Sequence, residues 1–279
     1  MADLRLRARS ATEIVDAAFQ IYRRDGLEYI LVTAVTYAPL LIAQLMLFGA
    51  TNAAVDPRAM LGGFGALWLV LFILGIFGFA LMTAVVSRFS SDVYLGRSPD
   101  LAAILREMLP KVPRLIGASF LLAIVMMLGA IPFIASMAMG SVGVGVLGFI
   151  LAVVWSFYAY ARFFASFPVI VLEDRGIIDA FTRSGFLSRG RKGHILVTIF
   201  LVFLIFVVLL IAVMAVAALV GNPMTGAVLQ MIYTIIAYPL IGIAQMVLYY
   251  DMRIRAEGFD IEVMTGALNA ASAPREATS

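Results

Sequence analysis

Long apolar runs recur along the chain and determine its predicted architecture. They lie at about residues 28–50, 64–86, 115–138, 142–165, 195–220 and 225–250. Each run has about 20 residues or more, the length that an α-helix needs to cross the hydrocarbon core of a bilayer. Each is expected to be helical, because a lone strand in lipid would leave its backbone hydrogen-bonding groups without partners. The pattern therefore predicts an all-α, polytopic integral membrane protein with six transmembrane helices.

Shorter segments with helical periodicity precede three of these runs. In the first, Ser10 and Glu13 have the spacing of a helix-capping box, and Ile14, Ala17 and Ile21 follow on one face. The second has its apolar side chains at helical spacing, at Leu101, Ile104, Leu105, Met108 and Leu109. The third opposes two apolar residues to three polar ones: Ile178 and Phe181 to Asp179, Thr182 and Arg183. We predict three amphipathic helices that lie in the headgroup plane on the cytoplasmic side.

Two pairs of short strings indicate that this arrangement is repeated. EIVDAAF, which starts at Glu13, is similar to GIIDAF, which starts at Gly176, and YILVT from Tyr29 is similar to HILVT from His194. The predicted unit is an amphipathic helix followed by a transmembrane hairpin, used three times. Similar physical constraints on unrelated segments would also produce such strings, and the sequence leaves both interpretations open.

The composition agrees with a membrane protein and excludes several kinds of chemistry. Hydrophobic residues make up 63% of the chain and the mean hydropathy is +1.04, far outside the usual range of soluble domains. The absence of cysteine excludes disulfides, thiolate metal sites and cysteine catalysis. His194 is the single histidine, and we expect an interfacial residue rather than a catalytic base. No cofactor, metal ligand or catalytic residue is predicted.

The charges show which side of the membrane each loop occupies. Of the 20 Lys and Arg residues all but Arg58, hence 19, fall on one side of the predicted spans. The positive-inside rule then places both termini in the cytoplasm, with 1–264 as one transmembrane domain and 265–279 as a disordered tail. The acidic residues follow the same distribution except for Asp56, so this face is zwitterionic. Electrostatic binding of nucleic acid is therefore not expected.

Polar side chains within the spans are few. Gln44, Gln230 and Gln245 are amides at membrane depth, where they either form interhelical hydrogen bonds or line a shared polar cavity. Arg162 lies within a turn of the cytoplasmic end of the fourth run, from which its guanidinium can reach the headgroups. The spans otherwise lack the ionisable residues that are typical of pumps.

Two charged stretches are candidates for binding. Arg189, Arg191 and Lys192 precede the fifth run and are predicted to contact anionic lipid headgroups. The stretch YYDMRIRAEGFDIE, which follows the sixth run, alternates in sign, and Gly258 is expected to end its helix. We predict that it forms an ion-pair cluster at the cytoplasmic face or an interaction site there. The predicted members are Asp251, Arg253, Arg255, Glu257, Gly258 and Asp260, together with Glu173, Arg183 and Arg189.

Three passages resemble one bacterial family. ATEIVDAAFQIYRRDGLEYI, FPVIVLEDRGIIDAFTRSGFLSRGRKGHIL and LYYDMRIRAEGFDIE are similar, in this order, to segments of the glycerophosphoryl diester phosphodiesterase membrane-domain family. The resemblance implies a six-helix integral domain of the bacterial inner membrane with no established activity. In some members this domain is fused to a soluble barrel that performs phosphodiester hydrolysis, which needs a metal site and acid–base histidines. Because this chain has one histidine, we expect it to share the membrane architecture of the family but not the phosphodiesterase activity in the family's name.

The function predicted from these features is that of a non-enzymatic scaffold or accessory protein. It would organise membrane lipids or a protein partner at the cytoplasmic face. A transporter or channel for a small neutral or lipid-like solute, with a cavity lined by the glutamines, is one alternative. A lipid-headgroup enzyme is the other, with its acid–base or metal-binding candidates at Glu173, Asp174, Asp251, Glu257 and Asp260.

Overall fold

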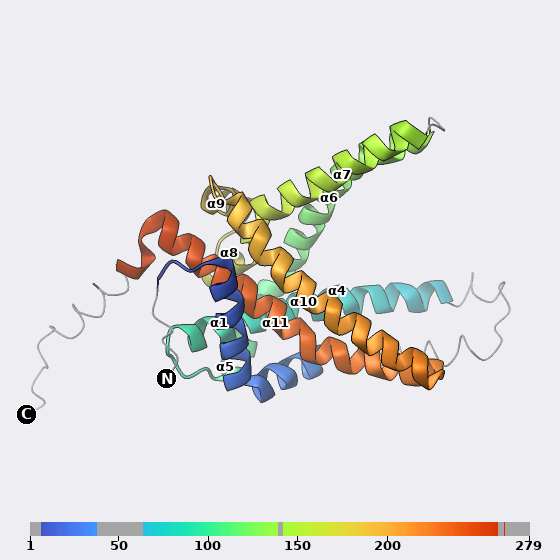
Figure 1. Cartoon of the computed structure of the whole chain (residues 1–279). Coiled ribbons are helices and arrows are strands. Elements are labelled where there is room, and N and C mark those ends of the chain that lie inside the picture. The colour runs from blue at the N-terminus through green and yellow to red at the C-terminus, as the bar shows by residue number, and fades with distance from the viewer. Residues whose placement is uncertain (1–6, 38–63, 139–141, 262–264, 266–279) are drawn as a thin grey trace, which may run out of the picture.

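The computed structural model describes residues 7–37, 64–138, 142–261 and 265, which form helices and no strand (Figure 1). In chain order the elements are α1 (Ala11–Arg24), a helix at Gly26–Tyr37, α4 (Phe64–Tyr94), α5 (Leu101–Met108), the 3-10 turn η1 (Leu109–Lys111), α6 (Val112–Ala138), α7 (Val142–Phe163), α8 (Ser166–Leu172), α9 (Ile177–Leu187), α10 (Lys192–Val220) and α11 (Pro223–Glu257). The all-α prediction is thereby confirmed.

Within these described residues, five helical segments are long and apolar enough to cross a membrane. They are Ile73–Tyr94, Leu101–Met137, Gly143–Leu172, Lys192–Val220 and Pro223–Glu257. The remaining predicted span, 28–50, begins in the apolar helix Gly26–Tyr37, and its residues 38–50 lie outside the described part of the chain. The described helices thus fit a multi-pass membrane protein, and the span 28–50 stays a prediction.

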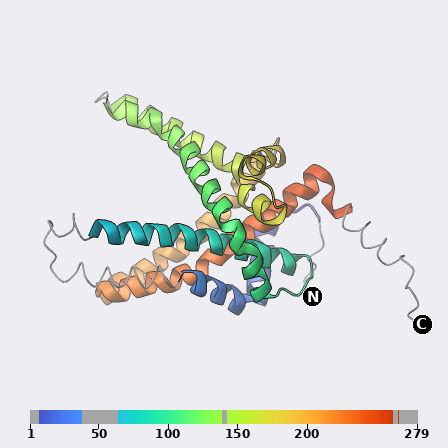
Figure 2. The ribbon, with the colours of Figure 1, turned by 180° about the vertical axis from the view of Figure 1, so that it is seen from behind.

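The short helices and the charged ends of the long helices gather at one end of the molecule, which we call the polar end. Figures 1 and 2 show α1, α5, α8, α9 and the last turns of α11 at this end. From it, α4 and the α10–α11 hairpin extend in one direction. The α6–α7 hairpin extends in another and diverges from them with distance.

The amphipathic helices use their apolar faces to contact protein. Ser10 and Glu13 form the predicted capping box, with the Ser10 hydroxyl accepting from the Glu13 amide. Ile14, Ala17 and Ile21 are almost fully buried, and α1 packs on α10 and α11, so the predicted apolar stripe of this helix contacts the bundle.

On α9 the predicted face was only partly correct. Phe181 is buried, as expected, but Ile178 is 68% exposed. The inner face of α9 is formed by Ala180, Ser184 and Leu187, because these small and apolar side chains allow α9 to approach α7 and α8 closely. Ile178 consequently lies on the outer surface.

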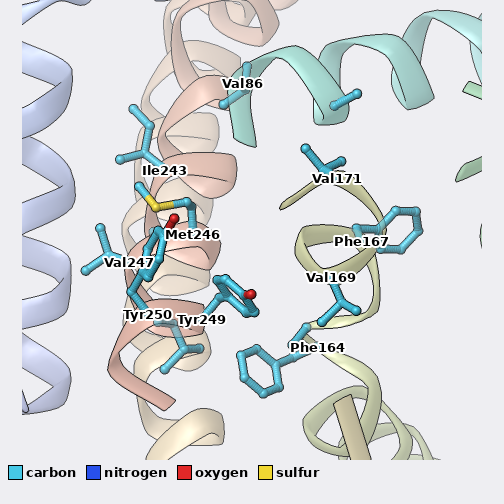
Figure 3. Packing of buried hydrophobic residues seen from close by; sticks show 14 of the residues in the cluster. Val86, Phe164, Phe167, Val169, Val171, Ile243, Met246, Val247, Tyr249 and Tyr250 are labelled. Atoms are coloured by element: carbon cyan, nitrogen blue, oxygen red, sulfur yellow. The ribbon is translucent and has the colours of Figure 1, made fainter. Parts of the chain in front are cut away.

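The protein core is concentrated in the polar half of the bundle. Figure 3 shows Met246 and Tyr249 of α11 opposite Phe164 and Val169 of the α7–α8 segment, and all four are buried. Farther from the polar end little is covered, and only 6% of the apolar stretch of α10 is buried. Such exposed apolar helices require an apolar solvent, so the outer halves of the hairpins are suited to lipid contact.

The helix α11 continues beyond the predicted end of its span at residue 250. Asn222 accepts hydrogen bonds from the amides of Met224 and Thr225 at its start, and Pro223 occupies the first helical position. Asp251 and Ile254 are buried, which stabilises two further turns. Gly258 then ends the helix as predicted, with φ 67°.

Gly258→Ala is therefore expected to destabilise the protein by about 1–2 kcal/mol, because a Cβ is strained in the left-handed conformation. The expected result is a lower thermal-unfolding midpoint in detergent. Gly193→Ala is the control, since Gly193 is helical and a Cβ there meets no atom within 4 Å. An equal midpoint for the Gly258→Ala and wild-type proteins would contradict this account of the helix end.

Candidate functional site

The central interaction at the polar end is formed by Arg183 of α9. Its Nε donates to both carboxylate oxygens of Glu173, at 3.1 and 3.0 Å, and its two terminal nitrogens donate to the carboxylate of Glu257 in the last turn of α11. The Tyr249 hydroxyl donates to Glu173 Oε1 at 2.8 Å. One guanidinium thus joins the ends of α8 and α11, in a fork geometry that suits two carboxylates.

The three charged side chains of this cluster are mostly buried. The side chains of Arg183, Glu173 and Glu257 are 14%, 12% and 24% exposed. The hydrogen bond to Glu257 and the nearby Glu173 charge raise the pKa of Arg183 against the opposing effect of desolvation, so its positive charge is stabilised. The predicted contribution of Glu173, Arg183 and Glu257 to one ion-pair cluster agrees with this geometry.

Asp251 is the centre of a second group of contacts. Its carboxylate is 1% exposed and accepts from the backbone amide of Arg9 at 2.7 Å and from Nε of Arg255 at 2.8 Å. Arg255 also donates to the Arg9 carbonyl at 2.6 Å. The segment before α1 is therefore attached to the last turns of α11, by a buried carboxylate whose charge is met by hydrogen-bond donors.

His194 belongs to the same group, which the sequence did not reveal. Its Nε2 lies 3.1 Å from Oδ2 of Asp251, and the ring is partly buried. The sequence predicts an interfacial residue and gives no sign of this contact, which forms because the fold brings α10 beside α11. The two residues are 57 positions apart, and no local spacing signals the contact.

Aromatic rings pack against the charged residues of the stretch YYDMRIRAEGFDIE, which we call the closing stretch. The Arg253 guanidinium lies 4.0 Å from the centre of the Phe259 ring and pairs with Glu257. Phe259 stacks on Tyr250, which stacks in turn on Tyr94 of α4. The turn at Gly258 thus returns the chain to the bundle.

Two members of the predicted cluster are not brought into it. In the described part of the chain, neither Asp260 nor Arg189 forms an ion pair, and Arg189 is exposed. The residues of the basic stretch 189–192 have different contacts. Arg191 donates to the Arg255 carbonyl at 2.6 Å, whereas Lys192 Nζ lies 4.4 Å from the centre of the Tyr158 ring. Only part of this stretch is thus available to lipid headgroups.

Ser184 has a role that sequence reasoning missed. Its hydroxyl accepts from the amide of Ala165 at 3.0 Å and donates to the carbonyl of Arg162 at 2.9 Å. These two backbone groups lie where α7 ends and α8 begins, so they lack the partners that a continuous helix would supply. Ser184 therefore stabilises the break and attaches α9 to it, which supplies the partners that an interrupted helix needs.

Of the predicted glutamine cluster, Gln230 and Gln245 lie within the described residues, and these two do not meet. Gln245 donates to the Phe164 carbonyl at 2.6 Å, which is an interhelical hydrogen bond of the kind expected. Gln230 lies fifteen residues earlier on the same helix, about 22 Å away along its axis, so the two cannot share a site. Gln44 lies outside the described residues.

A cavity of about 430 Å³ lies between α4, α6, α7, α8 and α11. Most of its lining is apolar, including Phe79, Met126 and Phe167. Polar groups come from Gln245 and Ser119, among few others. This composition suits a lipid chain or another apolar molecule better than an ion.

Four of the five candidate catalytic acids, all except Asp260, are paired with basic side chains. Asp174 pairs with Arg114 at 3.0 Å, and Glu173, Asp251 and Glu257 contact basic side chains as described above. Among the described residues no group of three histidine or acidic side chains is placed to hold a metal ion. Comparison of the chain with protein-family models, with curated proteins and with solved structures finds no match.

Arg183→Ala is expected to lower the free energy of unfolding by roughly 2 kcal/mol, because it leaves two partly buried carboxylates without their shared partner. Arg175→Ala is the matched control. Arg175 pairs with the same Glu173 but its side chain is 46% exposed, so an effect below about 1 kcal/mol is expected. Thermal unfolding in detergent measures both. Similar losses for the two variants would argue against a central role for Arg183.

Proposed function

We propose that the protein is a six-span membrane protein built from three related units, with both termini in the cytoplasm of a bacterial cell and the polar end at the inner face of its membrane. Supporting this, α5 precedes the α6–α7 hairpin as α9 precedes the α10–α11 hairpin. By the same order α1 precedes the helix Gly26–Tyr37 and α4. The positive-inside distribution of charges supports the orientation.

Equivalent local geometry supports the repeat. Each unit ends in a residue with positive φ: Gly96 after α4, Asp174 after α8 and Gly258 after α11. In the two similar strings, the hydroxyls of Thr33 and Thr198 are buried and donate to the carbonyls four residues earlier, at 3.0 and 2.9 Å. The two strings thus share one local hydrogen bond, which agrees with the proposed repeat.

We propose further that the protein acts as a non-enzymatic scaffold or accessory at the cytoplasmic face. The observation that carries this function is the division of the polar end into two surfaces. In the stretch YYDMRIRAEGFDIE, Asp251, Arg253, Arg255 and Glu257 pair within the polar end, which fixes the last turns of α11. The outer face of α9 remains open, with Ile178, Phe186 and Arg189 exposed. An exposed surface of aromatic, aliphatic and arginine side chains on a rigid support is typical of binding.

A second candidate function is the binding or transport of a lipid-like molecule. The apolar cavity between α4, α6, α8 and α11 favours it. The scaffold remains the first choice because its surface is formed by the segments that resemble the phosphodiesterase membrane-domain family.

Phe186→Glu is expected to remove a bound partner without unfolding the protein, since this side chain is 45% exposed. Wild-type and variant proteins would be purified in native lipid, followed by mass spectrometry of the proteins and lipids that accompany them. Ile261→Glu is the control, because Ile261 is 64% exposed at the polar end but lies outside α9. The proposal requires a companion that is lost only with Phe186→Glu. The same companions for all three proteins would contradict it.

The proposed orientation predicts which single cysteines are labelled from outside the cell. Because the chain has no cysteine, each introduced thiol is the only reactive one. Met224→Cys, at the exposed turn between α10 and α11, should react with an impermeant maleimide in intact cells. Thr265→Cys, beyond α11, should react only after permeabilisation. The opposite pattern would place the polar end outside.

A further inference from the structure

The surface between α7 and α10 combines two cations with two apolar helix faces. Arg162 at the end of α7 donates to the Tyr158 hydroxyl at 3.4 Å, and Lys192 at the start of α10 lies over the ring of the same tyrosine. Among the described residues, neither cation has a carboxylate within ion-pair distance. Both charges therefore lack the acidic partner that most bases at this end possess.

The faces that lead away from these cations are apolar. On α7 the exposed side chains Leu151, Val154 and Tyr158 precede Arg162 at intervals of three or four residues, so they form one stripe. Because Tyr158 contacts Lys192, this stripe is directed toward α10. On α10 the corresponding stripe follows Lys192 through Leu196 and Ile199, which are partly buried against the protein core, to Phe203, which is 59% exposed.

The helices that carry these stripes diverge. In both Figure 1 and Figure 2 the α6–α7 hairpin separates from the α10–α11 hairpin with distance from the polar end, although α7 and α10 remain in contact near it. The closed end of the wedge thus bears positive charge and the open part is apolar. These are the two properties that an anionic amphiphile requires.

We propose that Arg162 and Lys192 bind the phosphate headgroup of an anionic phospholipid whose acyl chains lie between α7 and α10. The inference rests on the proposed membrane architecture and names a lipid ligand for its inner face. It changes the predicted headgroup site, because Arg191 is engaged by the Arg255 carbonyl and Arg162 takes its place beside Lys192. Tyr158 contacts both cations, since its hydroxyl accepts from Arg162 and its ring lies under Lys192.

The position of Arg162 is built into the fold. Its carbonyl accepts from Ser184, and its guanidinium lies 5.5 Å from the ring centre of Phe163. The guanidinium also lies beside Gly185 of α9, where a Cβ would be 3.6 Å from an Arg162 nitrogen, an ordinary contact distance. The site is thus supported by α9 and does not depend on a freely mobile side chain.

The test compares phosphatidylglycerol with phosphatidylcholine. Native mass spectrometry of the detergent-purified full chain would count the lipid molecules retained from each. The wild-type protein should retain one phosphatidylglycerol in preference, and Arg162→Gln with Lys192→Gln should weaken its retention by roughly tenfold or more. The control, Arg97→Gln with Arg106→Gln, removes the same charge from exposed positions outside the wedge and should retain it. Equal retention of both lipids, or an unaffected double variant, would overturn the proposal.

A second measurement does not depend on the folding of that variant. The chain has two tryptophans, so Trp68→Phe leaves Trp155, one turn from Tyr158 on α7, as a single fluorophore. Phosphatidylglycerol with brominated chains should quench it at lower lipid fractions than brominated phosphatidylcholine. Equal quenching would overturn the proposal, as would loss of the preference in excess inorganic phosphate, which would assign the cations to a free anion. Neither readout involves the α9 surface, so a failed scaffold experiment leaves this test informative.

Discussion

The pairing of Arg183 with Glu173 and Glu257 is the interaction on which the rest of the structure depends. It joins α9, the end of α8 and the last turn of α11, so one guanidinium connects the second and third helical hairpins. Attraction between opposite charges is strongest where water is scarce, and these side chains are mostly buried. Without Arg183, Glu257 in the last turn of α11 would lose its contact with α9, and Glu173 would lose its link to α11 through this guanidinium.

Features whose causes are local along the chain could be predicted from the sequence. The capping box of Ser10 and Glu13 and the helix end at Gly258 each depend on a few adjacent residues, and both form as predicted. The long apolar helices follow from composition and length alone. Local reasoning failed at Ile178, because the face of α9 that turns inward is decided by how closely α7 and α8 can approach it.

The partners of the polar side chains could not be predicted, because the fold alone brings them together. His194 and Asp251 come from opposite helices of one hairpin, and Ser184 meets two backbone groups that exist only because α7 is interrupted. The sequence does draw attention to these residues, because His194 is the single histidine and Ser184 follows Arg183 in a charged segment. The sequence does not show which hydrogen-bonding group each of these side chains contacts in the fold.

The uneven distribution of buried surface gives the membrane a structural role. At the polar end, ion pairs, capped helix ends and stacked rings determine how α1, α9 and α11 lie relative to one another. Farther along, the α6–α7 and α10–α11 hairpins share few protein contacts, and their apolar faces are left to the surrounding solvent. A hairpin held at one end is positioned at the other by whatever fills the space beside it. We therefore expect the angle between the two hairpins to depend on the surrounding lipid as well as on the protein, and a lipid bound at the proposed site in the wedge would help to set it.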